Sequence, residues 1–167
     1  MNKRIVVIGS GNVATHLALA LYNKGYIIQQ VYSRQLANAE TLAKRVGGVA
    51  VDNIADIVGD ADFYFISVKD DAIAEIVSSL KIQNPDTVVA HTAGSVPLSV
   101  LSSKVAHSAV FYPMQTFTKS RELDFSIIPC FIEASDAETF SKIKVVAESI
   151  SNRVVEADSA RRKTMHL

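Results

Sequence analysis

Residues 8–14 are Ile8-Gly9-Ser10-Gly11-Asn12-Val13-Ala14, a glycine-rich turn between an apolar run and an amphipathic one. In the pattern G-x-G-x-x-A the first glycine permits a tight turn. The second lets the backbone approach a pyrophosphate, and the third small residue lets the next helix pack on the sheet. The first N–H groups of that helix then face the phosphates. The stretch predicts a dinucleotide site.

The flanking residues supply the context that such a turn requires. We expect a strand over Arg4–Ile8, a helix over Asn12–Lys24 that ends before Gly25, and a strand over Ile27–Tyr32. Short apolar runs then keep alternating with amphipathic helices, which is typical of βαβ units. The prediction is an α/β fold, a Rossmann-type doubly wound and mainly parallel sheet. The alternative interpretation is a structural strand–helix turn that binds nothing.

The same alternation predicts the remaining elements. Strands are expected at 49–51, 62–68, 87–91, 106–112, 127–133 and 153–157, and helices at 36–46, 54–58 and 73–80. Asp70 or Asp71 is expected to cap the third of these helices, and Ser95 a short helix with Pro97 at its first position. Ser135-Asp136-Ala137-Glu138 is typical of a capping box that opens another helix. Residues 113–126 are the least regular stretch and the expected functional loop.

Composition limits the classes of partner. The chain has 167 residues, 49% of them hydrophobic and 20% charged, which is globular rather than disordered. Lysine plus arginine equals aspartate plus glutamate, 17 against 17, so no broad basic field favours nucleic acid or a membrane surface. The apolar runs are too short for a membrane span or a signal-peptide core. The one cysteine, Cys130, excludes an internal disulfide, and its apolar surroundings indicate a buried structural thiol. We expect a cytoplasmic protein.

The residues after the second strand predict which dinucleotide binds. A site selective for NAD normally has a carboxylate at this position for the ribose hydroxyls. This chain has Ser33 and Arg34 instead, with no carboxylate before Glu40. A serine can donate a hydrogen bond to a 2′-phosphate, and a guanidinium offers it a planar, charged fork. The prediction is NADP, while the alternative for Arg34 is an ordinary solvated side chain.

Two later strand ends complete the predicted crevice, because ligands of a doubly wound sheet lie beyond the carboxyl ends of its strands. One supplies Ser67, Val68 and Lys69, and the other Thr92, Ala93 and Gly94. The full set of predicted cofactor-binding residues is Gly9, Ser10, Gly11, Asn12, Val13, Ser33, Arg34, Ser67, Val68, Lys69, Thr92, Ala93 and Gly94.

Three side chains are candidates for donating a proton to a reduced carbonyl or imine: His91, Lys69 and Tyr112. His91 has an ordinary pKa near neutrality, although a histidine at a strand end is more often a structural hydrogen bonder. His16 and His107 are expected to be structural. No Cys, His and carboxylate cluster has the spacing of metal ligands, so no metal is expected.

With these residues in hand, the chain resembles the NADP oxidoreductases of the 6-phosphogluconate-dehydrogenase-like superfamily. Those enzymes are relatives of pyrroline-5-carboxylate reductase, ketopantoate reductase and the deazaflavin-dependent NADP oxidoreductases. The resemblance is to a branch with a Rossmann domain followed by a helical domain of unknown function. It covers the phosphate turn, Ser33-Arg34, residues 66–73, His91-Thr92-Ala93-Gly94-Ser95, and Phe111-Tyr112-Pro113-Met114-Gln115-Thr116-Phe117. Two positions depart from the branch pattern: Lys69 stands in place of a proline, and Tyr112 in place of a histidine.

The resemblance implies a division of the chain and an activity. Residues 1–157 would form the NADP-binding Rossmann domain, and 158–167 would begin a helical segment or truncated second domain that covers the nicotinamide and forms a homodimer. The implied activity is hydride transfer between nicotinamide and a small carbonyl or imine substrate. A non-catalytic NADP-binding redox sensor or regulatory module is the alternative, because no convincing general acid stands among these residues.

Overall fold

The chain alternates strands and helices through residues 2–115 and 123–166, which the computed structural model describes. The strands are β1 (Arg4–Ile8), β2 (Ile27–Tyr32), β3 (Val49–Val51), β4 (Phe63–Ile66), β5 (Val88–His91), β6 (Ser108–Pro113), β7 (Cys130–Ala134) and β8 (Val154–Glu156). The α-helices are α1 (Asn12–Lys24), α2 (Leu36–Val46), α3 (Ile73–Ser79), α4 (Ser99–Ser102), α5 (Ala137–Ile150) and α6 (Ser159–His166). Short 3₁₀ turns are η1 (Ile54–Asp56), η2 (Asp70–Ala72) and η3 (Phe125–Ile127).

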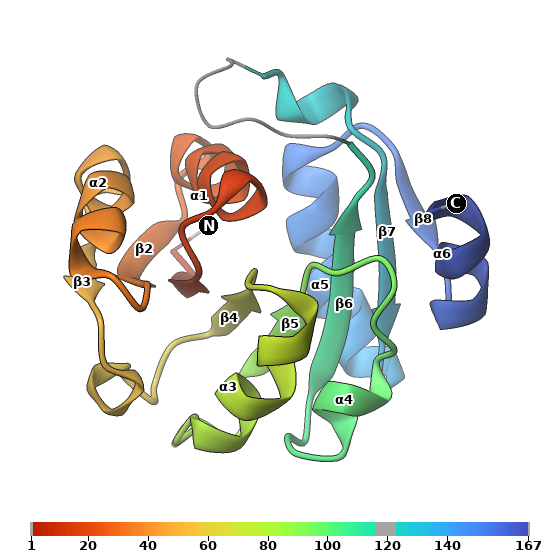
Figure 1. Ribbon diagram of the computed structural model, residues 1–167. Helices are drawn as coiled ribbons and strands as arrows, with labels where there is room; N and C mark the ends of the chain where they lie inside the picture. The colour runs from red at the N-terminus through yellow and green to blue at the C-terminus, as the bar shows by residue number, and fades with distance from the viewer. Residues whose placement is uncertain (1, 116–122, 167) are drawn as a thin grey trace.

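All these strands form one sheet with helices on both faces (Figure 1). The strand order is β3-β2-β1-β4-β5-β6-β7-β8. From β3 to β6 every neighbouring pair is parallel, whereas β7 runs antiparallel to β6 and β8 parallel to β7. The prediction of a Rossmann-type, mainly parallel sheet is confirmed. The order reverses between β1 and β4, and this position is where doubly wound sheets bind their ligands.

Strand β1 shows why the sheet is covered on both faces. Ile5 and Val7 belong to a core that includes residues of α1, α2 and α5, while Val6 and Ile8 belong to a second core with α3 and α4. All four side chains are completely buried. Successive residues of a strand point to opposite faces, so a continuous apolar run suits a strand that is buried on both.

Two predicted helix caps are wrong. The turn η2 begins after Lys69 and α3 after Ala72, and no side chain caps either start. The helix after β5 starts at Ser99 rather than at Pro97. Two of the expected capping residues bind each other: Ser95 Oγ donates a hydrogen bond to Asp70 Oδ2 at 2.9 Å, across 25 residues of sequence. Each residue therefore binds the other instead of capping its own helix.

The later elements also start at other residues than predicted. Strand β7 begins at Cys130 rather than at residue 127, because Phe125–Ile127 forms a 3₁₀ turn. Helix α5 is capped by Asp136, whose Oδ1 accepts a hydrogen bond from Thr139 N at 2.7 Å. Part of the expected functional loop, residues 116–122, lies outside the described residues.

Within the described ranges, no helix is long and apolar enough to pass through a membrane.

Candidate functional site

The glycine turn lies at the switch point of the sheet, where the ends of three strands meet. Gly9 N donates to Tyr32 O of β2 at 2.8 Å, and Ser67 N donates to Ile8 O of β1 at 2.8 Å. The turn after β1 is thus held between the end of β2 and the end of β4. The predicted pyrophosphate turn therefore lies beside the strand ends that lead to Ser33-Arg34 and to Ser67-Val68-Lys69.

The two glycines of the turn have different surroundings. Gly9 has φ +129°, and a Cβ there would lie 2.1 Å from Ser67 O, so both its conformation and its packing require glycine. Gly11 has φ −75°, which any residue adopts, and a Cβ there would have no neighbour within 4 Å. Gly11 is the N-cap of α1, a position that favours glycine, and the space beside it is open to the close approach of a ligand.

The start of α1 is suited to an anion. Its N-cap is Gly11, with no side-chain cap, and no acidic residue stands in its first turn. Backbone N–H groups and the positive end of the helix dipole therefore face the open edge of the sheet without a competing carboxylate. Ala14 is completely buried behind the turn, as the small third position of the motif requires.

Ser33 and Arg34 extend from the end of β2 at the same edge. Ser33 N donates to Val51 O of β3 at 3.2 Å, which fixes the backbone there. The Arg34 side chain is exposed and has no hydrogen-bond or ion-pair partner in residues 2–115 and 123–166. Its guanidinium can therefore turn toward a phosphate without breaking a contact within the described chain.

The segments after β4 and β5 are joined to each other. Thr92 N donates to Ile66 O at 3.2 Å, and Thr92 Oγ1 donates to Ser67 Oγ at 3.0 Å. Ser95 and Asp70 add the contact described above. We refer to residues 92–96 as the β5 turn. It lies two strands away from β1, on the side toward which a dinucleotide bound at the glycine turn would extend.

Tyr112 of β6 packs directly on the β5 turn. A Cβ at Gly94 would lie 2.7 Å from the tyrosine Cζ, so glycine at this position admits the ring. Burial raises the pKa of Tyr112, and its phenol stays protonated at neutral pH. Lys69, by contrast, is exposed at the start of η2. Tyr112 thus lies beside the β5 turn, and Lys69 lies just after β4.

His91 is in a different environment from an acid catalyst. Its ring is completely buried, and its Nδ1 accepts a hydrogen bond from Ala93 N at 3.1 Å. Burial lowers the pKa of His91 to about 4, and the positive charge of Arg162 also lowers it. The neutral ring acts as a structural acceptor within the β5 turn.

Sequence reasoning did not find Arg162, which contacts the same turn. Its guanidinium is completely buried and donates to Gly94 O at 3.3 Å and Val96 O at 2.8 Å. The stretch 159–167 reads only as a basic helix start, and its partners are about 66 residues away. Nothing local in the sequence identifies this contact.

Outside this site, the described residues hold no cluster of metal-binding side chains, and Cys130 and His107 have structural surroundings. No group of three or more His, Cys, Asp or Glu residues there could hold a metal ion. Cys130 is completely buried, and burial raises its pKa to about 12, which confirms the predicted buried thiol. His107 pairs with the helix cap Asp136 at 3.2 Å, in agreement with a structural role.

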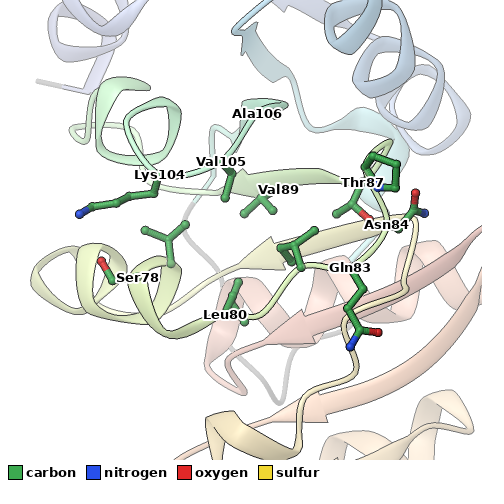
Figure 2. Close-up of a pocket in the computed structure, with 12 residues that line it drawn as sticks. Ser78, Leu80, Gln83, Asn84, Thr87, Val89, Lys104, Val105 and Ala106 are labelled. Carbon is green, nitrogen blue, oxygen red and sulfur yellow. The ribbon is translucent and has the colours of Figure 1, made fainter.

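A cavity of about 530 Å³ lies near the amino ends of β5 and β6, between the end of α3 and the segments that precede these two strands (Figure 2). Apolar side chains such as Leu80, Val89 and Val105 form much of its wall, and Lys104 adds a charged group to the lining. The glycine turn is at the carboxyl ends of the strands, so this cavity is separate from the candidate site.

Comparison with known proteins agrees with this geometry. Residues 4–94 match the model of a family described as NADP oxidoreductase, coenzyme F420-dependent. The solved structure of Bacteroides fragilis BF3122, which carries the name NADP oxidoreductase, is 46% identical with a TM-score of 0.95. It aligns with 99% of this chain, which spans 64% of that protein. No curated protein matches the chain.

More distant structures share the fold. TM1727 of Thermotoga maritima is 20% identical over 97% of the chain, with a TM-score of 0.78. A pyrroline-5-carboxylate reductase of Coxiella burnetii is 17% identical over 95% of the chain, with a TM-score of 0.76. The chain spans 60% of the length of each of them.

Proposed function

Because the chain belongs to the NADP oxidoreductase, coenzyme F420-dependent family, we propose that it binds NADP(H) across the carboxyl ends of β2, β1, β4 and β5. The pyrophosphate lies on the glycine turn and the start of α1, and the adenosine 2′-phosphate meets Ser33 and Arg34. The nicotinamide half extends toward Ser67 and the β5 turn.

The observation that carries this proposal is Gly11. It is a glycine for which neither the backbone conformation nor the packing of the described chain gives a reason. A bound pyrophosphate gives one, because a Cβ at this position would occupy the space of the ligand.

Titration of NADPH by its nicotinamide fluorescence tests the proposal. We expect wild-type protein to bind, and Gly11→Ala to bind at least about tenfold more weakly while keeping its fold. Gln35→Ala is the matched control, because Gln35 is the exposed N-cap of α2 and, like Gly11, makes no cap hydrogen bond through a side chain. Undiminished binding by Gly11→Ala would contradict the proposed pyrophosphate site.

Selectivity for NADP over NAD is the second part of the proposal and rests on Arg34. A loss of about 1.4 kcal/mol at the 2′-phosphate corresponds to a tenfold change in affinity. Arg34→Ala should therefore weaken NADPH binding about tenfold or more and leave NADH binding nearly unchanged. Arg45→Ala removes the same charge from the last turn of α2 and serves as the control. An unchanged ratio of the two affinities in Arg34→Ala would refute the assignment.

For the activity, we propose hydride transfer between the nicotinamide and a small carbonyl or imine substrate. The cofactor supplies the hydride chemistry, and the chain supplies binding and orientation. Tyr112 is the preferred proton donor of the three candidates, since it packs on the β5 turn with its phenol protonated, while His91 is buried and neutral. Tyr112→Phe should lower turnover more than NADPH affinity.

A non-catalytic NADP sensor is the second candidate function. The observation in its favour is the burial of His91. The sequence makes His91 a candidate proton donor, but its side chain is completely buried and offers no surface to a substrate. A panel of small carbonyl and imine compounds, followed by NADPH absorbance, separates the two. Oxidation of NADPH by any panel member supports the enzyme, and tight binding without turnover across the panel favours the sensor.

We also propose how this domain is used. Residues 1–157 act as the cofactor domain and 158–167 as the start of a helical domain, since the similar solved structures are longer than this chain. That helical part covers the nicotinamide and joins two copies into a homodimer in the cytoplasm. Light scattering of the protein together with its helical domain gives the mass in solution, and a monomer would contradict the dimer.

A further inference from the structure

Arg162 carries the largest of the completely buried side chains among the described residues. It lies on α6, at the β8 edge of the sheet (Figure 1). A guanidinium keeps its charge at every accessible pH, so burial is tolerated only where its N–H groups and its charge are satisfied. The contacts of Arg162 therefore have to be specific.

One group of contacts fixes the guanidinium to the sheet. Nη1 donates to Glu133 Oε1 of β7 at 2.6 Å and to Ala157 O, just after β8, at 2.9 Å. The Glu133 carboxylate balances the charge, and its side chain is only 23% exposed. A short, charge-assisted contact of this kind holds the planar fork in one orientation.

The other contacts reach the β5 turn. Nε donates to Gly94 O at 3.3 Å and Nη2 to Val96 O at 2.8 Å. Both acceptors are backbone carbonyls in the segment that faces the nicotinamide half in the proposed function. The turn is also held by Thr92, which bonds Ile66 O and Ser67 Oγ, by Ala93 N on His91 Nδ1, by an exposed hydrogen bond from Ser95 to Asp70, and by the Tyr112 ring against Gly94.

We propose that Arg162 is a positioning residue for the nicotinamide half of the cofactor. It fixes the backbone of the β5 turn through two carbonyls and acts on the cofactor only through that turn. The adenosine half lies on β1 and β2, at the far side of the switch point, and within the described residues the hydrogen bonds of Arg162 do not extend there. The inference rests on the proposed binding of NADP(H).

The two halves of the cofactor can be tested with separate probes. Adenosine 2′,5′-bisphosphate occupies only the adenosine half, whereas NADPH occupies both. In Arg162→Met we expect the affinity for NADPH to fall about tenfold, because buried hydrogen bonds to a charged donor are lost. The affinity for the bisphosphate should stay within about twofold of wild type. Hydrogen exchange of the amides in residues 93–96 should become faster.

Two further variants keep the result interpretable. Arg161→Met is the matched control, because Arg161 is the exposed neighbour on α6 and its Nη1 donates only to Glu156 O, at 3.4 Å. It should change neither affinity. Arg162→Lys keeps the charge beside Glu133 and so preserves the fold, but one amine cannot serve all four acceptors. It should reproduce the selective loss of NADPH affinity in smaller measure.

Each outcome has one meaning. A selective loss of NADPH affinity in both Arg162 variants supports the inference. Equal losses for the two probes indicate a merely structural arginine and overturn it, as does no loss for either. If wild-type protein binds neither probe, the proposed function fails, and the inference fails with it; this result is seen in wild type alone and is distinct from the others.

Discussion

At the scale of single residues, the glycine turn could be predicted from the sequence, whereas the contacts of Arg162 could not. The roles of Gly9 and Gly11 follow from local sequence, because a strand and a helix on either side fix the turn. The contacts of Tyr112 and Arg162 depend on backbone 18 and about 66 residues away, which no local pattern contains. Tyr112 was a candidate for its chemistry alone, and Arg162, whose partners on the β5 turn are distant in sequence, was missed.

The two glycines should respond to the same substitution with losses of very different size. Gly9→Ala places a Cβ against Ser67 O in a left-handed conformation, and we expect a loss of about 3 kcal/mol or more in the free energy of unfolding. Gly11→Ala meets no atom within 4 Å and should cost about 1 kcal/mol or less, through its N-cap position. Urea unfolding of both variants measures this, and similar losses would contradict the distinction.

His91 makes stability depend on pH. Its pKa is lowered from 6.5 to about 4 in the folded chain, so the unfolded chain binds the proton first as pH falls. The stabilisation is complete above pH 6.5 and is lost as pH falls toward 4. Lowering the pH from 7 to 5 should therefore lower the free energy of unfolding by about 2 kcal/mol through this group.

The matched variant for that measurement is His91→Asn. The amide oxygen can still accept the hydrogen bond from Ala93 N that the ring accepts in wild type, but it does not titrate. Urea unfolding at pH 7 and pH 5 should give a smaller pH dependence in the variant than in wild type. An equal dependence in the two proteins would show that His91 is not its source.

At the scale of elements, the sequence predicts which helices and strands are present better than it predicts the residues at which they begin and end. The first five elements have the predicted bounds, because glycines after α1 and α2 stop each helix in a left-handed turn. Later helices and strands differ from their predicted bounds where a side chain hydrogen-bonds a distant part of the chain. Ser135 is the clearest case: as the first residue of a capping box it was the expected cap, but its Oγ accepts a hydrogen bond from Ser108 N of β6 at 3.0 Å. Asp136 therefore caps α5 in its place.

Helix α5 should depend on Asp136 rather than on the last acidic residue of that motif, Glu138. Asp136 Oδ1 binds Thr139 N, and this hydrogen bond holds the pKa of the carboxyl well below its usual range. Asp136→Ala should lower the free energy of unfolding by about 1 to 2 kcal/mol. Glu138→Ala removes only an exposed i,i+4 pair with Lys142 and should cost about 0.5 kcal/mol or less. Thermal or urea unfolding checks the contrast, and equal losses would contradict it.

At the scale of the whole molecule, the sheet changes from parallel to antiparallel pairing between β6 and β7. Parallel neighbours need a crossover, usually a helix, whereas antiparallel neighbours do not. The described part of the connection from β6 to β7, residues 114–115 and 123–129, contains a 3₁₀ turn but no α-helix, and β7 is antiparallel. From β7 to β8 the helix α5 provides the crossover, and that pair is parallel. The least regular stretch of the sequence, residues 113–126, coincides with this change.

The proposed cofactor would contact four strand ends of one sheet, so its binding should stabilise the domain as a unit. At a concentration of NADPH about a hundred times its Kd, the gain is about 2.7 kcal/mol, which for a chain of this size raises Tm by about 5 to 10 °C. NADH at the same concentration should give a smaller rise, because Arg34 has no 2′-phosphate to bind. Scanning calorimetry measures both shifts as single transitions. With its affinity lowered about tenfold, Gly11→Ala should show only about half of the NADPH shift. An undiminished shift in this variant, or a shift that is equal for the two nucleotides, would place the ligand elsewhere than on the glycine turn and Arg34.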